Sequence, residues 1–295
     1  IRRQGRAGRR RLVSDPTTPQ QETPPNVNEQ TPPHVNVWGS PALPTTVKRR
    51  RPVGMGDVVL GLIYSQVFAA IAVVAIMIAS LARLQNLSAT TINDDIEGIL
   101  SSGPATVAAL LATWSGFLLA TWWAATHKGD RDWRSVLSWG FNWRRDLPIA
   151  VIFVVAFRAL EWLVTIILTN AGIDVDELSN AGLVTDFTGV WLAVMVVAAV
   201  LGAPIVEELF FRGLFLTTAR RRLGTAGGVL LSSIVFGVLH AQTTAAASTY
   251  TITATTLIGL GLAVLVVRTG RLGTAITAHI LMNASGVGLA LALAG

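Results

Sequence analysis

The chain has 295 residues, of which 52% are hydrophobic and only 14% are charged, and it contains no cysteine. This composition, with a mean hydropathy of +0.55, is typical of a membrane protein rather than of two soluble domains. The lack of cysteine excludes disulfides, thiolate metal sites and cysteine nucleophiles. The formal charge of +6 would fit a nucleic-acid-binding protein, so the positions of the basic residues matter more than their sum.

The N-terminal segment is basic and rich in proline. Ten of the 23 lysines and arginines precede residue 52, in the clusters Arg2–Arg11 and Lys48–Arg51, and eight of the twelve prolines precede residue 48. Too few apolar residues lie between the clusters to offset the entropy lost on ordering the chain. We therefore expect residues 1–47 to form a disordered tail.

Seven apolar stretches follow, and each is a candidate membrane helix. A helix rises about 1.5 Å per residue, so about 20 apolar residues cross a hydrocarbon core of about 30 Å. The fifth stretch is short for a full crossing, and we expect it either to extend into the Ala/Thr-rich residues after it or to be only partly inserted. The predicted spans are residues 58–82, 104–125, 147–168, 189–216, 227–240, 251–267 and 272–294.

Basic residues alternate between the loops of this arrangement, as expected if lysine and arginine collect on the cytoplasmic side. They occur before the first span, between the second and third, after the fourth, and between the sixth and seventh. The other loops carry only Arg83 among basic residues, and residues 169–188 are acidic. We therefore predict an integral protein of the plasma membrane, with its N-terminus cytoplasmic and its C-terminus outside. Since topology and anionic lipid explain the basic residues, membrane lipid is an expected partner and nucleic acid is not.

The last third of the chain carries polar residues inside its apolar stretches. Ionisable groups are costly in the hydrocarbon, so each one is a functional candidate. In the segment EELFFR, Glu208 and Arg212 are four residues apart and share one helix face, while Glu207 points about 100° away. In the next apolar stretch, His240 ends the segment FGVLH.

The final span adds His279 and Asn283, one turn apart on the same helix face. Together these residue types support hydrolysis. A carboxylate with a neutral imidazole, Glu207 with His240, can remove a proton from water. An imidazole beside a carboxamide, His279 with Asn283, can donate hydrogen bonds to a tetrahedral oxyanion. Zinc held by Glu207, His240 and His279, with an open position for water, is the alternative, and the sequence does not separate the two.

Each of these residues also has a purely structural interpretation. Glu208 and Arg212 can form an ion pair without a catalytic role, because charges inside membranes usually pair. Single histidines and Asn283 commonly make hydrogen bonds between helices. Arg158 and Glu161, three residues apart in the third span, are expected to pair and to lock that span against its neighbours. The occurrence of all six motif residues together in the last third favours a site.

Over roughly residues 190–290 the sequence resembles the CPBP family of intramembrane proteases, the CAAX-protease and bacteriocin-processing family also called Abi. The motifs E-E-x-x-x-R, F-x-x-x-H and H-x-x-x-N occur in that order on successive apolar segments. The resemblance implies a multi-helix fold with an intramembrane site and endopeptidase activity on membrane-associated peptides or lipid-modified C-termini. Members are described both as glutamate-type and as zinc-type peptidases. The resemblance implies water activation by Glu207 and His240, oxyanion binding by His279 and Asn283, and supporting roles for Glu208 and Arg212.

We therefore predict an all-α bundle of about seven transmembrane helices. Its parts are a basic, proline-rich cytoplasmic tail (1–47), N-terminal transmembrane helices (48–188) and a catalytic membrane domain (189–295). The expected function is that of an intramembrane endopeptidase acting on membrane-associated peptides or proteins. The alternatives are a transporter or proton-coupled channel that relays ions through buried Glu and His, and a non-catalytic scaffold that binds a partner through its tail.

Overall fold

The computed structural model describes residues 52–84, 96, 98–128, 132–172, 182–242 and 244–294. The predicted N-terminal tail lies outside the described residues, as do residues 173–181 of the predicted acidic loop. Every regular element in the described part of the chain is a helix, which confirms the all-α prediction.

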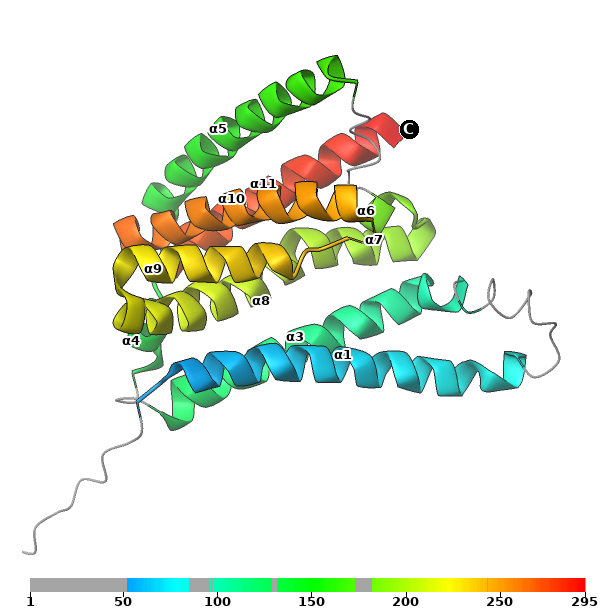
Figure 1. The fold of residues 1–295 in the computed structure, drawn as a ribbon, viewed down its shortest axis with the longest axis horizontal. Helices are drawn as coiled ribbons and strands as arrows, with labels where there is room; N and C mark the ends of the chain where they lie inside the picture. Colours follow the sequence, from blue (N-terminus) through cyan, green and yellow to red (C-terminus); the bar gives the residue numbers. More distant parts are fainter. Residues whose placement is uncertain are drawn as a thin grey trace, which may run out of the picture. The chain divides into compact units, whose positions relative to one another are not determined.

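Within the described residues, five long helices and one bent helical segment form the fold (Figure 1). The long helices are α1 (Met55–Leu84), α3 (Gly103–His127), α5 (Trp143–Asn170), α10 (Ala245–Thr269) and α11 (Leu272–Ala294). The bent segment comprises α7 (Gly189–Val197), η2 (Ala198–Gly202), α8 (Ala203–Glu207), η3 (Glu208–Phe215) and α9 (Leu216–Val238), of which η2 and η3 are π-helical. The short helices α4 (Trp133–Val136) and α6 (Gly182–Thr185) lie in the connections.

Six segments of the described chain are long and apolar enough to cross a membrane, against seven predicted spans. The difference lies in Gly189–Val238, a helical segment of 50 residues that contains both the fourth and the fifth predicted stretch. The chain turns back within it at Gly224, whose φ of +72° lies in the left-handed region that glycine adopts without strain. Gly228 then packs so close to Arg220 that a Cβ atom there would clash with the Arg220 backbone. The segment is therefore a hairpin, and the two predicted stretches are its arms.

The basic loops gather at one end of the helices, on the left of Figure 1. There Lys128, after α3, pairs with Asp57 at the start of α1 at 2.5 Å. Arg271, between α10 and α11, pairs with Asp146 at the start of α5 at 2.6 Å. The hairpin turn at Gly224 lies at the same end. This arrangement agrees with the alternation of basic loops seen in the sequence.

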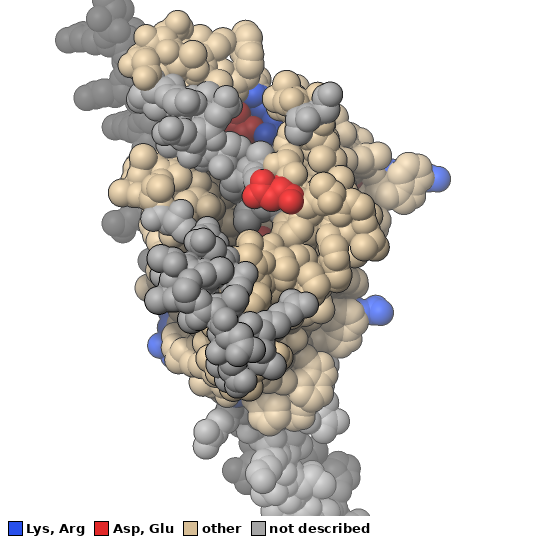
Figure 2. Space-filling model, turned by 90° about the vertical axis from the view of Figure 1, so that its right-hand side faces the viewer, with Lys and Arg blue, Asp and Glu red and all other residues tan. Residues whose placement is uncertain are grey.

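The opposite end of the helices faces the viewer in Figure 2. Acidic atoms lie near the middle of this face, and neighbouring basic atoms are set back from the surface. Asp186, in the connection between α6 and α7, is exposed. The two ends therefore differ in charge, as the loop sequences indicate.

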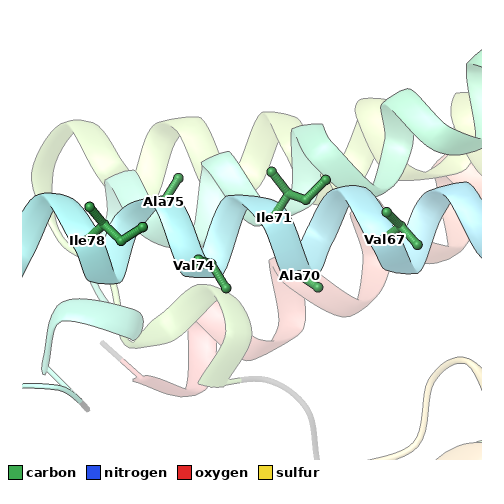
Figure 3. A pocket seen from close by; sticks show the side chains of 6 residues that line it. All are labelled: Val67, Ala70, Ile71, Val74, Ala75 and Ile78. Atoms are coloured by element: carbon green, nitrogen blue, oxygen red, sulfur yellow. The ribbon is translucent and has the colours of Figure 1, made fainter.

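Helices α1 and α3 pack closely against each other. A Cβ atom on Gly116 of α3 would clash with the backbone of Tyr64 and Ser65 on α1, so glycine permits this approach. Elsewhere, apolar side chains of α1 line a surface pocket (Figure 3), as expected for a face in contact with lipid. The lining residues are Val67, Ala70, Ile71, Val74, Ala75 and Ile78.

An aromatic core fixes the first arm of the hairpin. Phe210, Phe211 and Phe215 of η3 are buried, and Phe117 of α3 stacks on Phe210 with ring centroids 4.5 Å apart. From the second arm, Phe236 meets Phe211 edge to face at 5.1 Å. Aromatic pairs of this geometry stabilise a fold beyond the area that they bury. They hold in place the segment that carries the EELFFR motif.

A buried carboxylate joins the start of α5 to the start of α11. Asp146 is fully buried and accepts hydrogen bonds from Arg271 Nη2 (2.6 Å), Thr274 Oγ1 (2.5 Å) and the backbone N–H of Asn142 (2.5 Å). Asp146 also lies in the first turn of α5, where the helix dipole favours a negative charge. Arg271 belongs to a loop that is basic in the sequence, but its bond to Asp146 could not be predicted, because residues so far apart share no local pattern.

We predict that Asp146→Ala destabilises the fold. The substitution leaves the partly buried Arg271 and the hydroxyl of Thr274 without their acceptor. Removing one partner of a buried ion pair costs about 3–5 kcal/mol, and the partial exposure of Arg271 places the expected loss near the lower limit. Denaturant unfolding of the full chain in micelles measures the change in unfolding free energy. Asp132→Ala serves as the control. Asp132 is exposed in the connection between α3 and α5 and caps α4, so its loss should cost about 1 kcal/mol. Equal losses in the two variants would contradict the structural role of Asp146.

Candidate active site

The helix that carries the EELFFR motif is irregular where the motif begins. Pro204 has no N–H and cannot donate to a carbonyl of the preceding turn. The chain is π-helical on both sides of α8, in η2 and η3, and π-helical turns are frequent at functional sites. Glu207 ends α8 and Glu208 begins η3. The irregularity therefore coincides with the two motif carboxylates.

Glu208 lies at the centre of a buried cluster. Its Oε1 atom is 3.0 Å from Nη1 of Arg212 and 2.9 Å from Nδ1 of His279 on α11. The Glu208 side chain is 0% exposed and that of Arg212 is 1% exposed. Arg212 also donates from Nη2 to the carbonyl of Gly259 on α10 at 3.3 Å. The i, i+4 pair expected from the sequence is present, and it ties η3 to both α10 and α11.

Glu207 faces the other side of the same histidine. Its Oε2 atom lies 3.9 Å from Nε2 of His279, which is too far for a direct hydrogen bond. The Glu207 side chain is partly exposed, whereas Glu208 is closed off. Solvent can therefore reach Glu207 but not Glu208. Glu207 faces Nε2 of His279, the ring nitrogen that Glu208 does not contact.

His240 lies just after the second arm of the hairpin. Its Nδ1 atom is 2.7 Å from the carbonyl oxygen of Phe236, which can only accept, so this nitrogen carries the proton. The Phe236 ring lies 4.6 Å from the ring of His240 and 6.0 Å from that of His279. The guanidinium of Arg212 lies over the Phe236 ring, 4.3 Å from its centroid. Phe236 thus contacts the buried cluster on one side and His240 on the other.

Asn283 is held by a carbonyl group of the irregular helix. Its Nδ2 atom donates to the carbonyl oxygen of Ala199 in η2 at 2.8 Å. In a π-helix the partner of that carbonyl would be the N–H five residues later, and this position is Pro204. A carboxamide has two N–H donors, so one is left for another acceptor. The bond joins α11 to η2 next to the cluster.

Arg158 and Glu161 on α5 form the expected pair, with Nη1 and Oε2 2.5 Å apart. Arg158 also reaches α11, where it donates to the carbonyl of Met282 (2.5 Å) and to Oγ of Ser285 (2.9 Å). The pair therefore links α5 to the turn of α11 that carries Asn283, which agrees with the locking role expected from the sequence.

The structure brings four of the six predicted residues into one cluster. The other two, His240 and Asn283, lie at its edge and bond to backbone carbonyl groups. The cluster comprises Glu207, Glu208, Arg212 and His279. Within the described residues, no group of three or more His, Asp or Glu side chains is arranged to hold a metal ion. The predicted zinc ligands Glu207, His240 and His279 are therefore not gathered into one such group here.

Two connections of the site were missed by the sequence analysis. The bond from His279 to Glu208 joins residues 71 positions apart, and the bond from Asn283 to Ala199 uses a backbone group. Spacing along one helix predicts neighbours on that helix and not contacts with another. Pro204, three residues before the motif, is the one local signal that could have indicated an irregular helix.

Comparison with protein families agrees with the site. Residues 189–285 match a family model described as type II CAAX prenyl endopeptidase Rce1-like. The match begins with α7 and contains the whole cluster together with His240 and Asn283. Comparisons with curated proteins and with solved structures gave no match. The described residues include six helical segments long and apolar enough to cross a membrane, so the chain is an integral membrane protein. The resemblance found in the three motifs is confirmed, and residues 189–285 are similar to the Rce1-like type II CAAX prenyl endopeptidase family.

Proposed function

We propose that the chain is an intramembrane endopeptidase that hydrolyses peptide bonds of membrane-associated proteins. The observation that carries the proposal is the cluster in which Glu207 faces His279 while Glu208 and Arg212 hold that histidine from behind. The match to a CAAX prenyl endopeptidase model supports substrates with a lipid-modified C-terminus. The basic loops at one end of the helices support a cytoplasmic location for that end, because lysine and arginine collect on the cytoplasmic side. The plasma membrane is the proposed location.

Glu207 and His240 are the proposed water-activating pair. Solvent reaches Glu207, whereas Glu208 is closed off, so only the first carboxylate can meet a water molecule. The bond from His240 Nδ1 to the Phe236 carbonyl leaves Nε2 as the nitrogen that can accept a proton. The proposed step transfers a proton from water to Glu207 while the oxygen attacks the scissile carbonyl carbon. Glu207 then passes that proton to the amide nitrogen, the C–N bond of the tetrahedral intermediate breaks, and the amine and carboxyl products leave.

His279 and Asn283 are the proposed oxyanion pair. Nδ1 of His279 donates its proton to Glu208, and Nε2 is directed to the side on which Glu207 lies. Nε2 is a donor only when both ring nitrogens carry a proton, so the proposed oxyanion donor is the imidazolium form of His279. Asn283 keeps one amide N–H beyond its bond to Ala199. Donors that are fixed before the reaction stabilise the negative charge of a tetrahedral intermediate without reorganising. Arg212 supports the pair indirectly, because it balances the charge of Glu208.

Replacing the proposed base should stop cleavage without unfolding the protein. We expect Glu207→Gln to lower kcat by about 100-fold or more, because the amide cannot take a proton from water. Its nearest contact in the cluster is the 3.9 Å approach to His279, so the fold should persist. The measurement is cleavage of a prenylated peptide by the full chain in nanodiscs, with the products identified by mass spectrometry.

Asp186→Asn provides the control for that experiment, since Asp186 is exposed and far along the chain from the motif. It should cleave at the wild-type rate. Full activity in Glu207→Gln would contradict the proposal. Ion flux in proteoliposomes that is lost in Glu207→Gln, without any peptide cleavage by the wild type, would favour the transporter alternative instead.

A second substitution tests the buried pair. Arg212→Met leaves the fully buried Glu208 charge without its cation and should reduce the unfolding free energy by about 3–5 kcal/mol. Glu208→Gln combined with Arg212→Met removes both charges and should recover more than half of that loss. Unfolding of the three proteins in micelles gives the comparison. A double variant no more stable than Arg212→Met would show that the two charges are not coupled.

Chelation separates the glutamate mechanism from the zinc alternative. Because the proposed steps use only side chains and water, we expect cleavage to continue after incubation with a strong zinc chelator followed by dialysis. Activity that is lost on chelation and restored by added zinc would contradict the glutamate mechanism. That outcome would require His240 to move towards Glu207 and His279 in the active state.

A further inference from the structure

The connection between α3 and α5 presents a surface that the candidate site does not use. Four large aromatic side chains are exposed there within 11 residues, and the last two, Phe141 and Trp143, are 63% and 62% exposed. Three exposed arginines lie among them. We call residues 133–145 the aromatic–basic loop, and its exposed aromatic and basic residues are Trp133, Arg134, Trp139, Phe141, Trp143, Arg144 and Arg145.

Hydrogen bonds to α11 fix the backbone of the aromatic–basic loop. The N–H of Leu272 donates to the carbonyl of Ser138, and the N–H of Gly273 donates to the carbonyl of Gly140, both at 2.9 Å. These are the first N–H groups of α11, which have no partner within their own helix. The loop therefore caps α11, and its exposed side chains stay at the level where the helices α5 and α11 begin.

The inner face of the loop is packed into the protein. Val136 and Leu137 belong to the aromatic core, and Leu137 lies against Gly213 of η3. Because these aliphatic side chains fill the inner face, the aromatic side chains are directed outwards. A patch of exposed indole and phenyl rings is unfavourable in water, whereas the boundary between lipid and water favours such rings.

The arginines add positive charge at the same level. The guanidinium of Arg134 lies over the ring of Trp133, and that of Arg144 lies over the ring of Trp143, each 5.5 Å from the ring centroid. A guanidinium stacked on an aromatic ring keeps its N–H groups available at its edge, where they match the oxygens of a phosphate. We propose that the aromatic–basic loop binds the phosphate headgroups of anionic phospholipids, with its indole rings in the membrane interface.

Charge complementarity identifies anionic rather than zwitterionic lipid as the occupant. Exposed Arg221 and Arg222 precede the hairpin turn at Gly224, and exposed Arg268 lies in the last turn of α10. The hairpin turn and this end of α10 both lie on the left of Figure 1, so the local potential is positive. Anionic headgroups carry a net negative charge, whereas the choline of a zwitterionic headgroup offsets the charge of its phosphate. The inference concerns a surface separate from the candidate site and holds whether or not the chain cleaves peptides.

Native mass spectrometry of the purified full chain tests this inference. The protein in detergent is titrated with phosphatidylglycerol or with phosphatidylcholine of the same acyl chains. A basic residue near anionic lipid typically strengthens binding about fivefold, so three residues that act together should give a preference of about 100-fold for phosphatidylglycerol, and at least about tenfold if only two of them reach one headgroup. High salt should reduce the preference, because it screens exposed charges.

Two triple variants then locate the preference. We expect it to be lost in R134Q/R144Q/R145Q and reduced much less in the matched control R221Q/R222Q/R268Q, whose three residues are exposed at the same end but lie outside the aromatic–basic loop. Equal losses in both variants would overturn the assignment to the aromatic–basic loop. Equal binding of the two lipids by the wild-type chain would overturn it without any substitution. The variant R134K/R144K/R145K keeps the positive charge. A preference that is retained in this variant and lost in the glutamine variant shows that the loss comes from the missing charge and not from misfolding.

Discussion

A fully buried carboxylate with partners on two different helical segments constrains the C-terminal half of this protein. Glu208 cannot remain ionised away from water unless its charge is compensated, and its compensation comes from Arg212 on the same segment and from His279 on α11. Separating α11 from η3 would leave this charge with one partner fewer. The same contacts that keep the helices together also turn the free nitrogen of His279 towards Glu207.

Helix α11 is held at several heights, and each contact involves a polar group within an apolar segment. At its start, Thr274 donates to Asp146 of α5, and near its middle His279 contacts Glu208. Further along, Asn283 donates to the carbonyl of Ala199, while Arg158 donates to that of Met282. Apolar packing between such helices is not directional, whereas these hydrogen bonds fix the rotation of α11 about its axis. The orientation of the candidate catalytic groups is therefore a consequence of how the helix is anchored.

Helix positions followed from the sequence because the length of an apolar stretch is set by the thickness of the bilayer. The Glu208–Arg212 and Arg158–Glu161 pairs followed from helical spacing alone. The two arms of the hairpin at Gly224 appear in the sequence as two apolar stretches, although in the structure they form one continuous helical segment. Contacts between helices, such as His279 with Glu208, were not predictable, because they depend on how the helices pack. The π-helical turns were missed because they are changes in backbone hydrogen bonding, which leave no periodic pattern in the sequence.

The most direct test of this account is whether the ring of His279 is hydrogen-bonded to Glu208 in a lipid bilayer. Solid-state NMR of the full chain, with nitrogen-labelled histidine and carbon-labelled glutamate, reports the separation of a ring nitrogen from a carboxyl carbon. We expect a strong coupling that persists in Glu207→Gln and disappears in Glu208→Gln, because Glu208 is the carboxylate in contact with Nδ1. No such coupling in the wild type, or a coupling that depends on Glu207 instead, would contradict it.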